Sequence, residues 1–562
     1  MKYFKAYQAK DMRIPTYFIE STAPDNVDDT QDRDNTDKEM PQDLRKQLRP
    51  IVPSDDAVKE IADILASGTD PNLVVMVHGF NNPEPDVLKM YTAAAKAIQR
   101  DDKILGGRGL VCVGYRWTSE KMGTPASGSW TALPTLPTWV LYFGAAIVLL
   151  SSPFFYLVWV FICKWAEVGV SLFAHLLALT GSIAAGLILM VVLLRAIVYF
   201  RDNYRASNYG VPDLIQIIRA IDQEVVEQRR RKGPKDQPDR LVQLSFIGHS
   251  MGGFVVTNTI RTLTDVFKHP VGALNHFGAD APPPGQHLKT IGTVFELKRF
   301  VLASPDIPAE TLLSDRGNFL ASSLLRFHEA YLFSNEGDEV LRQISTLANY
   351  FVFPAKSRDH GFRLGNVEIL STDFGLIKRP ENEFLGTLRI GNLTLQQLYD
   401  RLEQAQASRH RTTGTRRAQP SLPTVFSYFD CTDYVDQNNE GEPDQHLLTF
   451  AKCLKHKQGN AKARLSFPAH LRLLYAYVFK HKPNVHGGYF EGRLSQELIY
   501  RLACLGYDAT EATYGSESLL GKACADKQIR MLLSPHLAAR RSVRSETADA
   551  ASPPPAPDVR SS

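Results

Sequence analysis

Short apolar runs alternate with longer amphipathic segments through much of the chain. The apolar runs have strand length and contain few polar residues, as expected for strands that are buried on both faces. The segments between them repeat their apolar residues with a helical period and open with acidic residues. In chain order, these elements are Asp55–Ala66 (helix), Leu73–Val77 (strand), Glu84–Arg100 (helix), Gly109–Tyr115 (strand), Asp213–Gln228 (helix) and Leu241–Ile247 (strand). This alternation predicts an α/β fold with a doubly wound, mostly parallel sheet.

Further strands are predicted on both sides of this region. Glu296–Leu302, Glu329–Phe333 and Thr424–Phe429 have the same apolar character, and we expect the last of them to end the sheet. Near the start, Arg13–Ile19 has a proline close to its beginning, which favours an edge strand. Asp25–Glu39 is acidic and nearly free of apolar residues, so we expect a surface loop there. The Arg/Ser/Ala/Pro-rich residues 534–562 are predicted to form a disordered tail.

Two uncharged segments interrupt the α/β pattern. Trp139–Ile162 and Val168–Leu194 contain no Asp, Glu, Lys or Arg, and Lys164–Glu167 separates them. At a rise of 1.5 Å per residue, each segment can cross a hydrocarbon core of about 30 Å. We therefore predict a transmembrane hairpin at 138–200, in preference to two buried core helices. The hairpin divides the α/β domain into residues 1–137 and 201–533.

The charges around this hairpin favour one orientation. Only Lys164 lies in the connecting turn, whereas basic residues occur on both flanks: Arg116, Lys121, Arg195, Arg201 and Arg205. By the positive-inside rule, both ends of the hairpin should face the cytoplasm.

Composition excludes several classes of function. The 64 basic and 60 acidic residues give a formal net charge of +4, which is too balanced to indicate a nucleic-acid partner. The six cysteines show no C-x-x-C or Cys/His ligand spacing, so neither a structural zinc site nor a disulfide-rich domain is expected. No metal or organic cofactor is implied.

The most informative motif joins a predicted strand to a predicted helix. Gly248-His249-Ser250-Met251-Gly252 follows the Leu241–Ile247 strand and reads G-x-S-x-G. In this context the motif forms a sharp turn from which the serine projects, beside the positive end of the following helix. Ser250 is thus the predicted nucleophile.

A serine nucleophile needs a histidine to take its proton and a carboxylate to orient that histidine. Asp338 and Asp306 follow neighbouring strands; we favour Asp338 because it follows the later one. Asp430 and Asp433 are more distant candidates. His486 is favoured as the base because it lies beyond the last predicted strand, beside two glycines and an aromatic pair. His360 is the alternative among many others, namely His410, His446, His456, His470 and His481. The backbone N–H groups of Phe80 and Met251 are the predicted oxyanion donors.

These motifs together resemble the alpha/beta-hydrolase superfamily. More narrowly, they are similar to a bacterial, lipase- or esterase-like family of unknown function that pairs an HG-aromatic-Asn-Asn strand end with a GHSMG elbow. The resemblance spans about residues 70–500 and departs from the family where the hairpin is inserted and at the long stretch Tyr434–Pro483. It is carried by His78–Asn82, Tyr115–Ser119, Asp202–Ser207, Gly248–Gly252, Ser304–Asp306, Ser334–Asp338, Arg363–Gly365 and His486–Phe490.

The resemblance implies a serine-hydrolase mechanism without naming a substrate. With the hairpin, it leads us to expect a multi-pass membrane protein of the bacterial inner membrane with its hydrolase domain in the cytoplasm. The expected substrate is a lipid or another acyl ester, and the lipid bilayer is the expected partner. A membrane thioesterase, a protein deacylase or a lipase toxin is a related alternative. An inactive hydrolase fold that serves as a membrane scaffold is an alternative of another class.

Overall fold

The computed structural model describes most of the chain. The described residues are 3–24, 40–105, 109–119, 198–232, 240–266, 290–313, 324–346, 361–407, 422–438, 441, 443–454, 464–480, 482–539 and 541. The acidic loop Asp25–Glu39, the predicted hairpin spans and His360 lie outside them. Within the described ranges, no helix has both the length and the hydropathy that a membrane crossing requires.

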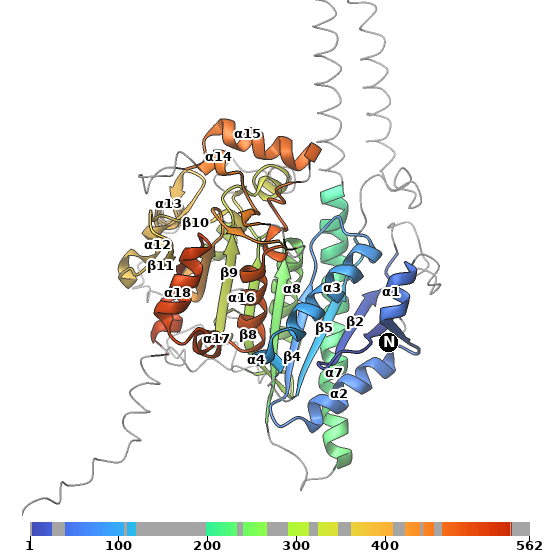
Figure 1. Cartoon of the computed structure of the whole chain (residues 1–562). Coiled ribbons are helices and arrows are strands. Elements are labelled where there is room, and N and C mark those ends of the chain that lie inside the picture. Colours follow the sequence, from blue (N-terminus) through green and yellow to red (C-terminus); the bar gives the residue numbers. More distant parts are fainter. Residues whose placement is uncertain are drawn as a thin grey trace, which may run out of the picture.

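A large sheet runs through the middle of the molecule (Figure 1). Its strand order is β11-β17-β14-β9-β8-β6-β4-β5-β2-β1-β3, and β7 pairs with β8 at one side. From β2 to β14 every neighbouring pair is parallel, so the prediction of a mostly parallel sheet is confirmed. The strands are β1 Phe4–Ala9, β2 Thr16–Ser21, β3 Leu48–Ile51, β4 Asn72–Val77, β5 Leu110–Arg116, β6 Val242–His249, β7 Thr290–Ile291, β8 Phe295–Ala303, β9 Glu329–Ser334, β11 Gly375–Leu376, β14 Phe426–Asp430 and β17 Arg530–Leu532.

Helices cover both faces of this sheet. One face carries α2 Asp55–Ser67, α7 Val211–Lys232 and α8 Met251–Val266, and the other carries α3 Glu84–Gln99 and α16 Arg493–Cys504. The remaining α-helices are α1 Gln42–Gln47, α4 Asp102–Leu105, α9 Ala309–Leu313, α12 Phe384–Thr387, α13 Leu395–Ala407, α14 Ala451–Leu454, α15 Phe467–Tyr475, α17 Tyr507–Tyr514 and α18 Glu517–Asp526. Two small sheets lie outside the main one: β10 Glu368–Ile369 with β12 Leu388–Ile390 and β13 Leu393–Thr394, and β15 Val435–Asp436 with β16 Gln445–His446.

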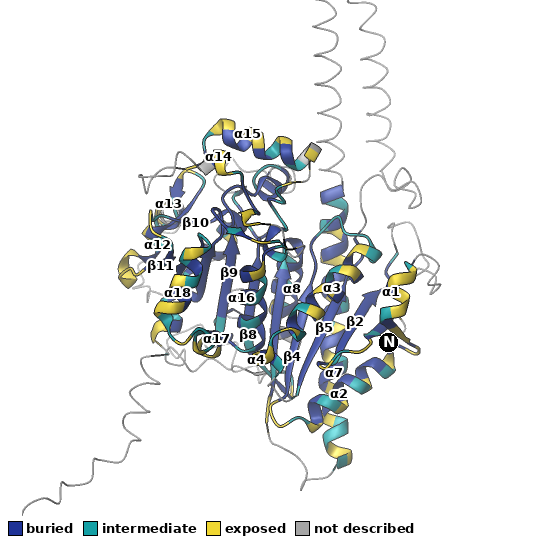
Figure 2. Ribbon diagram, in the orientation of Figure 1, coloured by how far each residue is buried: buried dark blue, intermediate teal, exposed yellow. Residues whose placement is uncertain are grey.

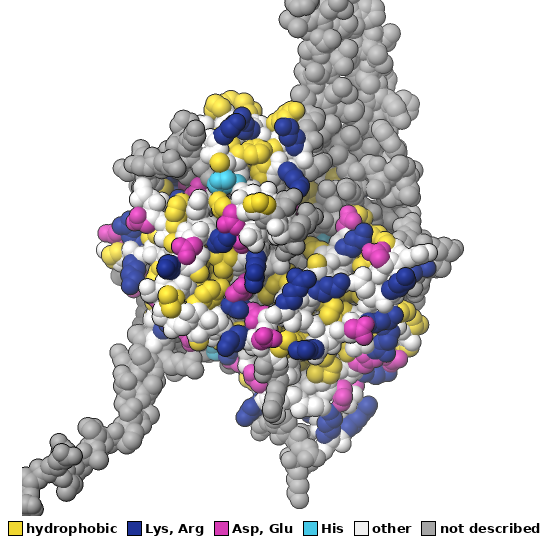
Figure 3. Space-filling view, viewed as in Figure 1, with side chains coloured by type: hydrophobic (Ala, Val, Ile, Leu, Met, Phe, Trp, Pro, Cys, Tyr) yellow, Lys and Arg dark blue, Asp and Glu magenta, His cyan; other side chains and the backbone are white. Residues whose placement is uncertain are grey.

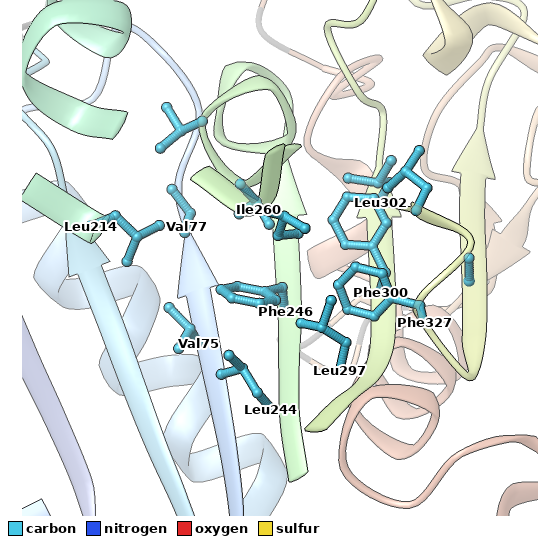
Figure 4. Close-up of a cluster of buried hydrophobic side chains, with 14 of the residues drawn as sticks. Val75, Val77, Leu214, Leu244, Phe246, Ile260, Leu297, Phe300, Leu302 and Phe327 are labelled. Atoms are coloured by element: carbon cyan, nitrogen blue, oxygen red, sulfur yellow. The ribbon is translucent and has the colours of Figure 1, made fainter. Parts of the chain in front are cut away.

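The strand period explains why the central strands read as continuous apolar runs. Val75 and Val77 of β4 pack into the core on the α7 and α8 side, whereas Val74 and Met76 pack on the α3 side. Because successive side chains of a strand point to opposite faces, a strand covered on both faces needs an apolar residue at every position. Figure 2 shows that the central strands are mostly buried, and Figure 4 shows part of the core around Phe246.

Two predictions about the margins of the sheet were wrong, and so was the predicted start of the C-terminal tail. The strand predicted at Arg13–Ile19 forms as β2, but it lies between β5 and β1 and is not an edge strand. The strand predicted as last, β14, is followed by β17, which pairs with it in antiparallel orientation. The tail does not become irregular at residue 534, because 535–539 are helical and Leu537 is buried.

Candidate functional site

The turn between β6 and α8 has the strained geometry that the motif predicts. Ser250 lies between the two elements with φ of 54°, a left-handed backbone conformation that costs a non-glycine residue energy. Its N–H donates to the Ala303 carbonyl at 3.0 Å, and its own carbonyl accepts from the Asp306 N–H at 3.1 Å. Backbone bonds to the end of the neighbouring strand therefore hold the turn in place.

Gly252, the second glycine of the motif, is required because the turn lies against β4. A Cβ on Gly252 would lie 2.2 Å from the Val77 carbonyl oxygen, so any other residue would force the helix away from the sheet. The loop after β4 also passes directly over the serine. A Cβ on Gly79 would lie 2.8 Å from the Ser250 Cβ and 3.3 Å from its Oγ. Only a glycine therefore lets this loop pass so close to the Ser250 side chain.

The peptide between Gly79 and Phe80 is held in a fixed orientation. The Gly79 carbonyl oxygen lies 2.7 Å from His78 Nδ1 and accepts from Asn82 Nδ2 at 3.1 Å. A trans peptide directs its N–H opposite to its carbonyl, so the Phe80 N–H points away from these two donors. The Met251 N–H belongs to the first turn of α8, where N–H groups lack intrahelical acceptors. Both groups predicted as oxyanion donors thus border the Ser250 turn.

A buried carboxylate that sequence reasoning did not single out stabilises this loop. Asp202 Oδ2 accepts from the Asn81 N–H at 3.0 Å and from Ser119 Oγ at 2.7 Å, and Ser119 Oγ accepts from the Asn82 N–H at 3.2 Å. Arg201 and Arg205 flank the other carboxylate oxygen at 3.0 and 3.7 Å. In the sequence, Asp202 was noted only as part of the Asp202–Ser207 motif. The available signal was that it is the first acidic residue after the uncharged segment Val168–Leu194.

Two arginines used for the membrane orientation have a different role in the structure. Arg116 is buried and forms an ion pair with Glu20, and Arg205 is buried beside Asp202. Both charges belong to ion pairs inside the α/β domain. They are not exposed charges of a membrane-flanking loop, so the positive-inside argument loses two of its five residues.

Asp338 and His486 are in direct contact. Asp338 is fully buried just after β9, and its Oδ2 lies 2.6 Å from His486 Nδ1. Ser304 Oγ donates to the same oxygen, and Oδ1 accepts the N–H groups of Val340 and Leu341 at 3.1 and 3.2 Å. This carboxylate is therefore fixed on both sides and presents one oxygen to the histidine ring.

The loop that carries His486 is pinned to the ends of two strands. Asn335 Nδ2 donates to the Val485 carbonyl at 2.8 Å, and His249 Nε2 lies 3.1 Å from the His486 carbonyl oxygen. The rings of His249 and His486 are 4.9 Å apart, which brings His486 beside the residue preceding Ser250. Among the described residues, neither His486 Nε2 nor Ser250 Oγ has a hydrogen-bond partner, although both atoms are buried.

The other predicted acids have structural partners. Asp306 forms an ion pair with Arg363 at 3.2 Å and accepts from Ser345 Oγ at 3.1 Å. Asp430 accepts from the Thr432 N–H and Oγ1, and Asp433 pairs with Arg530. Among the described residues, none of these three carboxylates forms a hydrogen bond or an ion pair with a histidine.

The remaining candidate histidines divide into two groups. His470 is buried and pairs with Glu339. His446 lies on β16, where burial lowers its pKa and the nearby Asp433 charge partly offsets that effect. His360, His410, His456 and His481 lie outside the described residues.

Burial keeps the two histidines nearest the turn neutral. Desolvation, with a smaller effect of Arg116, lowers the pKa of His78 to about 3. Desolvation and the neighbouring His486 lower the pKa of His249 to about 3 as well. The His78 ring stacks on Trp117 with centroids 5.2 Å apart, and its carbonyl accepts from the indole N–H at 2.9 Å. His78 thus supports the Gly79 peptide as a neutral ring.

Within the described part of the chain, no three His, Cys, Asp or Glu side chains come together as a metal site. A cavity of about 230 Å³ lies beside the first residues of β2 and β5, at the opposite ends of the strands from Ser250. No family model matches the sequence, and neither the curated proteins nor the solved structures contain a match.

Proposed function

We propose that this protein is a serine hydrolase of the alpha/beta-hydrolase class that cleaves carboxylic esters. The observation that carries the proposal is the left-handed Ser250 between β6 and α8, combined with the buried Asp338–His486 contact at the same edge of the sheet. A serine held in a strained turn, with a carboxylate-bound histidine nearby, is the arrangement that nucleophilic acyl transfer needs.

The reaction begins when Ser250 Oγ attacks the ester carbonyl carbon and His486 Nε2 takes its proton. The Asp338 carboxylate accepts a hydrogen bond from His486 Nδ1–H and stabilises the positively charged imidazole ring. The N–H groups of Phe80 and Met251 bind the negative oxygen of the tetrahedral intermediate. The C–O bond then breaks, His486 returns the proton to the leaving alcohol, and the acyl group stays on Ser250.

Water completes the cycle by the same steps. His486 takes a proton from the water while the oxygen attacks the acyl carbon, and the second tetrahedral intermediate is bound by the same two N–H groups. Its collapse releases the carboxylic acid as His486 returns the proton to Ser250. No step requires a group beyond those of the chain, the ester and water.

A membrane location and a lipid or acyl-ester substrate are parts of the same proposal. They rest on the predicted hairpin at 138–200. Described residues on either side of its two spans contact the loop after β4, which passes over Ser250. Ser119 on one flank donates to Asp202 on the other, and Tyr199 packs edge-to-face on Phe80 with ring centroids 5.7 Å apart. A hairpin inserted here would hold the Ser250 site close to a lipid surface.

The test compares two serines of the same strand and turn. Ser250→Ala should lower turnover of a p-nitrophenyl ester by about 10⁴-fold or more. Ser245→Ala, which removes another buried hydroxyl without a hydrogen-bond partner among the described residues, should keep the rate of the natural chain. Equal rates in Ser250→Ala and the natural chain would end the hydrolase proposal and favour an inactive scaffold.

A further inference from the structure

The residues that lead up to His486 have an unusual charge. Between Gln445 and Phe490 the sequence contains eight Lys and Arg and no Asp or Glu. This stretch alone therefore carries twice the formal net charge of the whole chain, which is +4. A segment of this kind attracts anionic surfaces and repels a second copy of itself.

Helix α15, in the middle of this stretch, presents apolar side chains to the outside. Phe467, Leu471 and Tyr475 are 74%, 50% and 54% exposed, and a spacing of four residues places them on one face of the helix. Only nine large apolar side chains are exposed in the described part of the chain, so three on one short helix form a distinct patch. We call these three residues the α15 stripe.

The opposite face of α15 packs on the loop that carries Asp338. Leu473 is buried against Gly337, where a Cβ on the glycine would lie 3.0 Å from the leucine Cδ1. His470 Nδ1 lies 2.6 Å from Glu339, and the Leu465 N–H donates to Glu336 Oε1 at 3.1 Å. The helix therefore lies above the catalytic edge of the sheet, at the top of the molecule in Figure 1.

Exposed basic residues surround the α15 stripe. Arg472 lies on α15 itself, Arg464 just before it, and Lys480 and Lys482 just after it. The Lys480 ammonium lies 5.9 Å from the centre of the Tyr475 ring. Figure 3 shows apolar and basic side chains side by side at this end of the molecule. The acidic groups that face α15, Glu336 and Glu339, are buried beneath it and engaged with its inner side.

We infer that α15 is an interfacial helix that inserts its apolar stripe into an anionic lipid bilayer. Aromatic and aliphatic residues on one face, with Lys and Arg around them, suit the boundary between headgroups and acyl chains. Protein interfaces, in contrast, tend to lack lysine and to place charges of opposite sign against each other. A dimer through this face would bring two strongly positive stretches together, so a lipid surface is the occupant that fits.

The role of α15 in catalysis rests on the proposed function, because it requires that Ser250 hydrolyses an ester. With α15 at the membrane surface, the loops bearing Asp338 and His486 face the lipid, and an ester can reach Ser250 from the bilayer. The binding of α15 itself does not require Ser250 to react. The two proposals can therefore fail separately.

The experiment compares two leucines of equal exposure. Leu471 on α15 and Leu519 on α18 are 50% and 51% exposed. Each is replaced in turn by a benzophenone amino acid in the full chain. The proteins are reconstituted with vesicles of phosphatidylcholine alone or with added phosphatidylglycerol, irradiated, and analysed for lipid and protein adducts. The same measurement in Ser250→Ala should give an unchanged lipid yield, whatever that variant does to hydrolysis.

We expect lipid adducts at position 471 at several times the yield at 519, rising further with phosphatidylglycerol. Arg472→Gln and Lys480→Gln should each lower that yield about fivefold at subsaturating lipid. Lys522→Gln, which removes an exposed charge on α18, should leave it unchanged. Protein adducts at 471, equal lipid yields at 471 and 519, or a yield indifferent to phosphatidylglycerol would each overturn the inference.

Discussion

Two buried aspartates follow neighbouring parallel strands, β8 and β9, yet they have different surroundings. Asp306 forms an ion pair with Arg363 and accepts a hydrogen bond from Ser345 Oγ, and neither partner is a histidine. Asp338 meets His486, Ser304 and two backbone N–H groups of the segment that follows it. The comparison shows that position at a strand end does not by itself bring a carboxylate into contact with a histidine. Its partner decides whether it can orient a base or only neutralise a charge.

The largest expected effect is on turnover in Asp338→Asn. The asparagine oxygen can still accept the Val340 and Leu341 N–H groups, but its amide would face His486 Nδ1 and favour the wrong tautomer. We expect ester turnover to fall about 10⁴-fold while the free energy of unfolding changes by about 1 kcal/mol or less. Steady-state kinetics and urea unfolding of the same preparation measure both. Full turnover in this variant would remove Asp338 from the mechanism.

Asp306→Asn should show the opposite behaviour. Loss of this charge leaves the Arg363 guanidinium, only 4% exposed, without its anionic partner. Breaking a buried ion pair on one side costs about 3–5 kcal/mol of unfolding free energy. Turnover per folded molecule should stay within about tenfold of the natural chain. If Asp306→Asn lost turnover as Asp338→Asn is expected to, the assignment of the acid would be reversed.

Glu339, the residue after Asp338, provides a closer comparison because it also binds a histidine. Glu339 binds His470 Nδ1 at 2.6 Å, the same distance that separates Asp338 from His486. This second pair lies under α15 and should contribute to stability alone. His470→Ala should lower the unfolding free energy by about 1–3 kcal/mol and preserve turnover of a small soluble ester. His486→Ala should lower turnover sharply and change the unfolding free energy little. Similar losses of turnover in both variants would contradict the distinction between the two pairs.

The smallest expected effect concerns pH. The pKa of His78 is lowered to about 3 by burial, whereas an unfolded histidine titrates near 6.5. Below pH 6.5 the unfolded chain thus binds a proton that the folded chain does not. The contribution of neutral His78 is complete above pH 6.5 and is lost as the pH falls toward 3, with a slope of up to about 1.4 kcal/mol per pH unit. Urea titrations give the unfolding free energies of the natural chain and of His78→Asn. Between pH 7 and 5 the difference between these two free energies should change by up to this slope, and a constant difference would contradict the prediction.

The parts of the fold that sequence reasoning could predict are those determined locally. The buried strands β4, β5, β6, β8 and β9 each appear as an apolar run, because their two faces are both covered. The turn at Ser250 could be predicted because a tight strand-to-helix junction requires glycine at fixed positions. Asp338 and His486, which the structure brings into contact, were chosen from strand order and from the glycines beside the histidine.

What could not be predicted depends on contacts between distant segments. β17 is three residues long and pairs with β14 about a hundred residues earlier, so neither composition nor period reveals it. The Asp202 contacts join Ser119, more than eighty residues earlier in the chain, to the loop after β4. The buried state of Arg116 depends on Glu20 of β2, its neighbour across the sheet. In the sequence, Asp202 and Arg116 cannot be distinguished from exposed charges, because their partners become neighbours only in the folded chain.

The most direct test of the central claim is to find which residue a fluorophosphonate probe modifies. The probe reacts with serines that an adjacent base has activated, so the modified peptide should contain Ser250. Peptide mass spectrometry should locate the adduct there in the natural chain and in Asp306→Asn, with much slower labelling in His486→Ala. An adduct on another serine, or a Ser250 labelled equally fast without His486, would contradict the account.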